Sequence, residues 1–193
     1  MYHIKNDKRA RASTELICAG LLACMKEKPF ARITITDVQR ASTVSRSTFY
    51  RNFDCLEDAL ALLCDRGFQA VFSEYNALPP EQRGSLAKAV FQYWFRSSTV
   101  LEALVEIHRT DILFDSLRRS SGLIQALQPM ADDPARFDYF VAIITSSMIG
   151  VLTVWVEHGK TETKDQMVQK LTSAFIEMAA ASGLELVAPA KRN

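Results

Sequence analysis

Long apolar runs, closely spaced cysteines and glycine-rich segments are all scarce in this sequence. Glycine (7 residues) and proline (6 residues) are too few among 193 residues for a collagen-like or disordered chain. No apolar run reaches the roughly 18 residues of a membrane span, because hydroxyl side chains and a glycine interrupt the longest one, 137–156. The N-terminal stretch also lacks the apolar core of a signal peptide. These absences predict a soluble, cytoplasmic protein with no membrane partner.

Metal-binding and catalytic motifs are absent as well. The four cysteines, Cys18, Cys24, Cys55 and Cys64, contain no CxxC pair and share no zinc-ligand spacing with the histidines. There is no glycine-rich phosphate loop, nucleophile elbow or HExxH motif. We therefore expect no catalytic residue, no metal and no cofactor. The thiols are expected to be reduced and packed in helices. The alternative that stays open is a thiol sensor at Cys24, which lies near two lysines in the sequence.

Apolar residues recur at helical spacing almost throughout the chain, and no segment of useful length alternates as a strand does. The segment 76–85, with its proline pair, is a loop, and Gly159 and Gly183 are expected helix stops. Asp54 and Asp133 stand where helix N-caps are expected. The pattern predicts an all-α protein with helices at about 6–28, a short one capped by Thr34 or Thr36, and further helices at 45–52, 56–75, 86–96, 100–109, 113–130, 134–158 and 164–182.

The segment 33–53, ITITDVQRASTVSRSTFYRNF, has the pattern of a helix-turn-helix. Two short helices joined by a tight turn allow the second helix to enter the major groove of DNA. Phe49 and Phe53 are one helical turn apart and are expected to be buried. The outward side chains combine short hydroxyls, which allow close approach, with arginines that reach guanine or phosphate. The predicted DNA contacts are Thr36, Ser45, Arg46, Ser47, Thr48, Tyr50 and Arg51.

Positive charge is concentrated at the N-terminal end. Residues 1–54 contain ten Lys/Arg and five Asp/Glu, a net charge of +5, while the remainder carries −4. A basic N-terminal quarter followed by a mildly acidic remainder is expected of a chain whose N-terminal quarter binds the phosphates of a nucleic acid. The competing interpretation is a helical hairpin that only packs and whose arginines are solvated. This asymmetry, taken with the ordered Tyr, Phe and hydroxyl positions, disfavours it.

The stretch resembles the DNA-binding domain of TetR-family transcriptional regulators over about residues 8–65. The matching positions are Ile35, Val38, Val44, Ser45, Thr48, Phe49, Tyr50 and Phe53. The resemblance implies an N-terminal three-helix helix-turn-helix DNA-binding domain (1–54). A long fourth helix then leads into a helical effector-binding and dimerisation domain (55–193). It also implies a homodimer, most often a repressor, whose affinity for a palindromic double-stranded DNA operator changes when a small apolar or amphipathic effector binds.

Two positions depart from the family pattern. Thr43 stands where the family commonly has glycine in the turn, and a β-branched residue is strained at positive φ, so we expect an adjusted turn. Leu56 stands where the family often has a lysine that reaches phosphate. One phosphate contact is then expected to be missing, or to be made by the helix N-terminus itself. This second departure keeps an alternative function open, a DNA-free coactivator or ligand carrier on the same scaffold.

The resemblance further implies an effector site among the later helices. The candidate lining residues are Phe68, Phe72, Phe91, Trp94, Phe95, His108, Phe114 and Tyr139. Each aromatic by itself is also typical of a packed core, and that alternative stays open.

The last two predicted helices, 134–158 and 164–182, are apolar on two sides. Such a helix is buried on two sides, so one face is expected to pack on the monomer core and the other on a second copy. The predicted dimer-interface residues are Ser147, Gly150, Val154, Val168, Leu171 and Phe175.

Overall fold

The structure is a computed structural model that describes residues 2–4, 7–124 and 133–181. Within these ranges all regular structure is helical, which confirms the all-α prediction. The α-helices are α1 (Lys8–Glu27), α2 (Ile35–Ser42), α3 (Arg46–Asn52), α4 (Leu56–Ala77), α5 (Leu86–Arg96), α6 (Ser98–Glu106), α7 (Thr110–Ser120), α8 (Pro134–Glu157) and α9 (Lys164–Ala181). Short 3₁₀ turns lie at Phe30–Arg32, Pro80–Gln82 and Ser121–Leu123.

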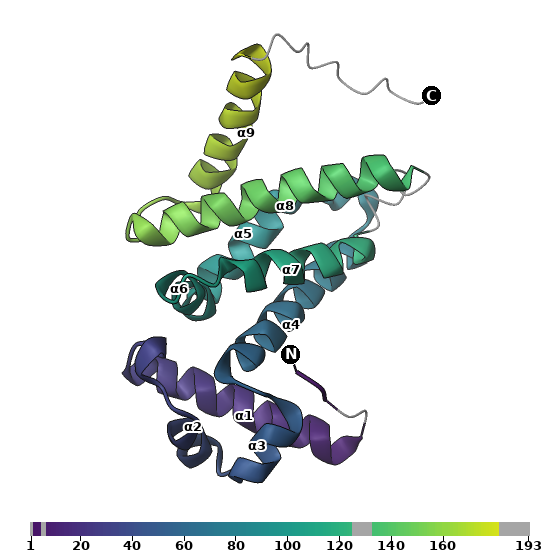
Figure 1. Cartoon of the computed structure of the whole chain (residues 1–193). Coiled ribbons are helices and arrows are strands. Elements are labelled where there is room, and N and C mark those ends of the chain that lie inside the picture. Colours follow the sequence, from purple (N-terminus) through teal and green to yellow (C-terminus); the bar gives the residue numbers. More distant parts are fainter. Residues whose placement is uncertain (1, 5–6, 125–132, 182–193) are drawn as a thin grey trace.

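The first three helices gather at one end of the molecule, and we call them the head (Figure 1). α4 runs from the head into the rest of the molecule. We call helices α4–α9 the body. α7 packs against both α4 and α8. α9 packs on α5 and projects beyond α8, on the side opposite to the head (Figure 1).

The head is held together by the packing of α1 on α2 and α3. Ile17 of α1, Val38 of α2 and Phe49 of α3 are 0–1% exposed. A Cβ atom at Gly20 would lie 2.8 Å from the Cβ atom of Ser42, so only glycine lets α1 and α2 approach this closely. Close backbone approach fixes the position of α2, and with it the position of the turn that follows.

Aromatic rings of α4 and α5 form the centre of the body. The rings of Phe68 and Phe72, both on α4, stack with centroids 6.1 Å apart. The ring of Trp94 on α5 meets Phe68 edge-on, with centroids 5.4 Å apart. Such ring pairs stabilise a core beyond the area that they bury. The contact therefore fixes α5 against α4.

A buried carboxylate joins α4, α7 and the N-terminal segment. Asp65 on α4 is 6% exposed, and its Oδ1 accepts a hydrogen bond from Arg119 on α7 at 2.8 Å. Tyr2 donates to the other oxygen of Asp65, and burial together with this hydrogen bond raises the pKa of Tyr2 to about 12. The His3 N–H donates to the carbonyl of Asn52, the last residue of α3, at 3.0 Å. The N-terminal segment thus connects the head to the body.

The thiols are packed rather than exposed. Cys18, Cys24 and Cys64 are buried, Cys55 is half-buried, and all four are free cysteines. Burial raises the pKa of Cys18 to about 11, and it also raises the pKa of Cys24. A reactive sensor thiol needs a lowered pKa. The direction at Cys24 therefore favours the packed thiol over the sensor.

The predicted helix ends are wrong in the middle of the chain. The sequence predicted helices at 100–109 and 113–130, whereas α6 ends at Glu106 and α7 occupies Thr110–Ser120. The cause is His108, which takes a left-handed conformation (φ 55°) and reverses the chain between the two helices. The end of the second predicted helix and the predicted stop at Gly183 lie outside the described residues.

α8 is long and apolar enough to cross a membrane by length and composition alone, with a mean hydropathy of 1.9 in its most apolar window. The fold accounts for this composition in another way. One face packs on α6 and α7 and buries Val141, Met148 and Leu152. The opposite face carries Ile143 and Val154, which are 54% and 46% exposed. A core helix with a second apolar face is expected where another protein surface covers that face.

Candidate DNA-binding surface and cavities

The start of α2 is fixed by a reciprocal pair of hydrogen bonds. The N-cap is Thr34 rather than Thr36, because Thr34 Oγ1 accepts from the Asp37 N–H at 3.2 Å. The Asp37 carboxylate in turn accepts from the Thr34 N–H at 2.8 Å. Lys28 Nζ lies 2.7 Å from the same carboxylate, and these contacts hold the pKa of Asp37 well below its usual range. Thr36 is exposed on the first turn of α2, where its hydroxyl is accessible.

The turn between α2 and α3 is not adjusted to avoid a left-handed residue. Thr43 takes φ 56° and ψ 17°, the conformation that glycine would adopt. For a β-branched residue this conformation costs on the order of 1–3 kcal/mol. The neighbouring Val44 N–H donates to Ser42 Oγ at 3.3 Å, which stabilises the turn locally. The expected adjustment is therefore wrong, and the turn keeps its form at an energetic cost.

The outward face of α3 is polar and positively charged. Ser45 caps the helix: its Oγ accepts from the Thr48 N–H at 3.3 Å and lies 3.1 Å from the Ser47 hydroxyl. Arg46 donates to the Tyr50 hydroxyl at 3.3 Å, and its guanidinium carbon lies 5.5 Å from the Tyr50 ring centroid. Hydroxyls thus cluster at the start of the helix, and an arginine is held over an aromatic ring beside them.

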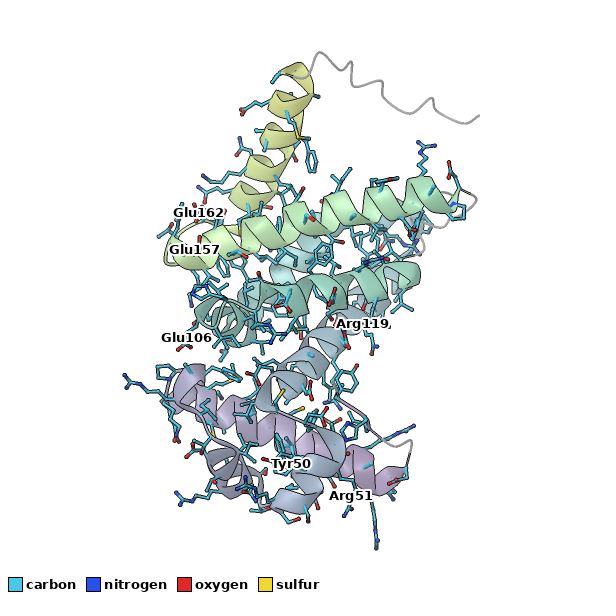
Figure 2. The ribbon with its side chains drawn as sticks, viewed as in Figure 1. Tyr50, Arg51, Glu106, Arg119, Glu157 and Glu162 are labelled. Atoms are coloured by element: carbon cyan, nitrogen blue, oxygen red, sulfur yellow. The ribbon has the colours of Figure 1, made fainter. Side chains whose placement is uncertain are left out.

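The inner side of α3 holds this face rigidly. Phe49 and Phe53 are 1% and 0% exposed, as the sequence predicts. The ring of Tyr50 meets that of Phe49 edge-on, with centroids 5.6 Å apart. Figure 2 shows Tyr50 and Arg51 on α3, at the end of the molecule remote from α9. A recognition surface on a well-packed helix needs little reordering when it binds a partner.

The start of α4 is acidic. Asp54 was predicted to cap this helix, but the N-cap is Cys55, which makes no side-chain capping bond. Instead the Asp58 carboxylate accepts from the Asp54 N–H at 2.9 Å, and Glu57 adds a second carboxylate to the first turn. Leu56 packs in the core at 9% exposure. Because acidic side chains already occupy this helix N-terminus, the structure does not favour a phosphate contact there.

Four residues of the predicted effector pocket belong to the packed core. Phe68, Phe72, Phe91 and Trp94 are 0–1% exposed. Phe72 also lines an apolar cavity of the body, and Trp94 lines a separate cavity between head and body. For these four residues the structure therefore favours the alternative that the sequence left open, which is packing in the core.

The other four predicted pocket residues are dispersed. Phe95 stacks on Trp155 with centroids 4.2 Å apart, and Phe114 lines a shallow hollow between α7 and α8. His108 is exposed in the turn after α6, and Tyr139 is 75% exposed on α8. His108 lies outside both helices because α6 ends early. Tyr139 faces outward because the buried stripe of α8 lies on its other side.

An apolar cavity of about 300 Å³ lies among α4, α5, α7 and α8. Among the residues that the structure describes, its polar side-chain groups are hydroxyls, and no charged side chain lines it. The lining residues are Phe72, Ser85, Leu86, Ala87, Val90, Leu117, Ser121, Ile124, Phe140, Val141, Ile144, Thr145 and Met148. A largely apolar cavity with a few polar groups is typical of a small-molecule site. Of this set only Phe72 was predicted from the sequence, because aliphatic residues at helical spacing are equally typical of a core.

A second apolar hollow, of about 460 Å³, lies between α8 and α9. Five of the six predicted interface residues line it, namely Ser147, Gly150, Val154, Leu171 and Phe175. The sixth, Val168, packs against the monomer core. Around this hollow Ile143 and Met178 are 54% and 56% exposed. The predicted residues thus gather around one apolar surface that the monomer leaves uncovered. We call this surface the α8–α9 groove.

This arrangement of helices is found in a solved structure. A protein from Syntrophomonas wolfei str. Goettingen, assigned to the TetR family of transcriptional regulators, superposes with a TM-score of 0.62 at 19% sequence identity. The match covers 92% of this chain and 99% of that chain. No family model and no curated protein matches the chain by sequence. The likeness establishes the fold, which is the all-α fold of a TetR-family regulator.

Proposed function

We propose that this protein is a cytoplasmic transcriptional regulator that represses genes by binding an operator as a dimer, and that a small molecule changes its affinity for DNA. Residues 1–54 form the DNA-binding domain, and residues 55–193 form the domain that binds the effector and the second copy. The observation that carries the proposal is the outward face of α3, where hydroxyls and arginines stand on a rigidly buried helix next to a tight turn.

The residues of α3 have different roles in this proposal. The N-terminal residues of a recognition helix contact base edges, so Arg46, in the first turn, is assigned to a base. Tyr50 and Arg51 lie nearer the other end of α3 and are assigned to phosphate. The hydroxyls of Ser45 and Ser47 are short enough for the helix start to approach the groove closely.

One copy of α3 cannot specify an operator. The seven residues of this helix span only about 10 Å at 1.5 Å per residue, which is enough for a few base pairs. Two copies related by two-fold symmetry read successive major grooves when they lie about 34–36 Å apart. The operator is therefore an inverted repeat.

The α8–α9 groove supplies the dimer interface of this proposal. Its apolar residues are uncovered in the monomer, and a Cβ atom at Gly150 would meet nothing within 4 Å. Placing the same two helices of a second copy against it forms a four-helix interface, in which each groove covers the other. This contact also buries the apolar outer face of α8.

The apolar cavity among α4, α5, α7 and α8 is the proposed effector site. Because the described lining is apolar except for the hydroxyls of Ser85, Ser121 and Thr145, we assign it an uncharged effector with few hydrogen-bonding groups. A charged ligand would lose its hydration there without gaining a partner. The cavity touches α4, which begins at the head, so occupancy can favour one placement of the heads over another.

Selection of bound sequences from a random DNA pool tests the DNA-binding part of the proposal. We expect an enriched inverted repeat, bound with an affinity that falls steeply with salt concentration. A protein that enriches no sequence, and whose weak DNA binding is insensitive to salt, would instead be a DNA-free coactivator or ligand carrier on this scaffold.

Filling the cavity tests the effector site. Ala87→Phe places a ring in the cavity, so uncharged aromatic or aliphatic compounds that raise the melting temperature of the wild type should no longer do so. Ala135→Phe, at an exposed position in the first turn of α8, is the matched control and should leave the response unchanged. Equal responses of both variants would place the effector elsewhere.

A further inference from the structure

A cavity of about 260 Å³ lies where the head meets the body, separate from the two apolar hollows described above. We call it the junction cavity. α1 contributes Leu22 and Lys26 to its wall, α4 contributes Leu63, and α5 contributes Trp94 and Arg96. An occupant of this cavity would therefore touch the head and the body at once.

The wall of the junction cavity includes a residue with an unpaired buried donor. Trp94 is 1% exposed, and its Nε1–H has no hydrogen-bond partner within the described residues. Leaving a buried donor unpaired costs about 1–3 kcal/mol. The other tryptophan, Trp155, shows the usual arrangement, because its Nε1–H donates to the Glu162 carbonyl at 3.1 Å. The orphaned donor belongs to a residue of the cavity wall, and it points to an acceptor atom on a ligand.

Among the described residues, the same cavity is lined by two positive charges and by no carboxylate. Lys26 and Arg96 are both exposed, and neither forms an ion pair in the part of the chain that the structure describes. The nearby Lys28, by contrast, is paired with Asp37 at 2.7 Å. Two cations on the wall that also contains the unpaired Trp94 favour a ligand with negative charge. The rest of the described wall is apolar at Leu22, Leu63 and Val100 and carries the hydroxyls of Tyr93, Ser97 and Thr99.

We propose that the junction cavity binds a small carboxylic acid. The carboxylate lies toward Lys26 and Arg96 and accepts the hydrogen bond of Trp94 Nε1–H, while the apolar part of the molecule packs on Leu22 and Leu63. The volume is slightly below the roughly 300–1,000 Å³ of sites for drug-sized ligands, so the acid is about as large as benzoate. Because the acid bridges α1 and α5, it stabilises one placement of the head on the body.

This site differs in chemistry and place from the proposed effector cavity, whose described lining residues carry no charge. A ligand titration without DNA therefore tests it independently of the proposed regulatory function. The probes are benzoate, phenylacetate and hexanoate, with benzamide and benzylamine as neutral and cationic analogues of benzoate. The readout is the indole N–H signal of Trp94 in the nitrogen–proton correlation spectrum of the full chain, assigned with Trp94→Phe.

We expect at least one of the three acids to shift the Trp94 signal at millimolar concentration and to leave the Trp155 signal in place. If benzoate is that acid, benzamide and benzylamine should bind at least tenfold more weakly. Arg96→Gln and Lys26→Gln should each weaken the acid about five- to tenfold, because each removes a charge-assisted contact. Arg118→Gln removes an exposed charge on α7 and should change nothing. A thermal melt of each variant establishes that it is folded.

Three results would overturn the proposal. The first is that none of the three acids moves the Trp94 signal. The second is that the neutral or cationic analogue binds as tightly as the acid. The third is that a folded Arg96→Gln protein binds the acid with unchanged affinity. Trp94→Phe replaces the indole with a smaller aromatic ring that has no N–H donor, so its affinity for the acid, measured by calorimetry, should also fall.

Discussion

Removing Arg46 and removing Arg51 should weaken DNA binding in different ways, although each change deletes one positive charge from α3. Arg46 is in the first turn and is held by the Tyr50 hydroxyl at 3.3 Å, which places it for a base edge. Arg51 is in the last turn and is exposed, which places it for phosphate. A base contact distinguishes sequences, whereas a phosphate contact contributes to all of them.

The two expected magnitudes follow from the dimer. Arg51→Ala removes one phosphate contact per half-site, so the slope of log affinity against log salt should fall by about 1.8, at about 0.9 per contact. Binding to a matched operator and to a scrambled one should weaken alike. Arg46→Ala should cost about 1–3 kcal/mol per half-site on the matched operator and relax the preference at one base pair. Tyr50→Phe should weaken binding to both operators alike but leave the salt slope nearly unchanged, because the tyrosine hydroxyl carries no charge that displaces a counterion.

Fluorescence anisotropy titrations of matched and scrambled operators at several salt concentrations measure both effects. Arg118→Ala, which deletes an exposed charge on α7 in the body, controls for the change in net charge. Full discrimination by Arg46→Ala would move the base-reading role to Ser45, Ser47 or Thr48. If every one of these substitutions left binding intact, α3 would not be the DNA-reading helix and the proposed function would be wrong.

Three further predictions concern the interface and the head. Gly150→Glu places a charge in the α8–α9 groove and should give monomers in analytical ultracentrifugation, so an unchanged dimer would show that the interface is elsewhere. Gly20→Ala should lower the free energy of unfolding by about 1–3 kcal/mol in a denaturation assay, because the added Cβ atom meets α2. Gly84→Ala is the control and should have little effect, because a Cβ atom there would meet nothing within 4 Å. Asp37→Asn should destabilise the protein at neutral pH. Because the folded-state pKa of Asp37 is lowered, this difference should shrink as the pH falls below the ordinary value of 3.8; a constant difference would mean that the carboxylate charge is irrelevant.

The sequence predicted well those features that depend on a few neighbouring residues. The bounds of α3 follow from Ser45 as a cap and from the spacing of Phe49 and Phe53, and each of these signals is local. The Asp133 cap of α8 is confirmed for the same reason, since its carboxylate accepts from the Arg136 N–H at 3.1 Å. Caps and short spacings are determined by contacts within one or two turns, so a single sequence contains them.

The cavities could not be predicted from the sequence, because each depends on how several helices pack. Val90 and Leu117 have the spacing of core residues and are core on one side, yet they also face a space that α5, α7 and α8 leave between them. The orphaned donor of Trp94 is equally invisible in the sequence. His108 shows a different limit: histidine adopts the left-handed conformation more often than most residues, but one histidine in a sequence does not indicate that it does so here.

The contact between α4 and α7 offers the sharpest test of how the effector cavity communicates with α3. α7 lines the cavity with Leu117, and its neighbour Ser116 donates to the buried Asp65 carboxylate. The other oxygen of Asp65 holds Tyr2, in the segment whose backbone donates to the end of α3. A hydrogen bond to a charged group contributes about 1.5–3 kcal/mol, which is comparable to a typical allosteric coupling of about 1–3 kcal/mol.

Ser116→Ala should therefore reduce the factor by which an effector changes operator affinity, by about fivefold or more, while the effector still binds. Ser120→Ala is the matched control, because Ser120 is also buried on α7 but makes no contact with Asp65 among the described residues. Operator affinity is measured with and without saturating effector, and effector affinity is measured by calorimetry on the free protein. If Ser116→Ala left the ratio of the two operator affinities unchanged, the coupling would not depend on the Ser116 hydrogen bond, since Arg119 still joins the Asp65 carboxylate to α7.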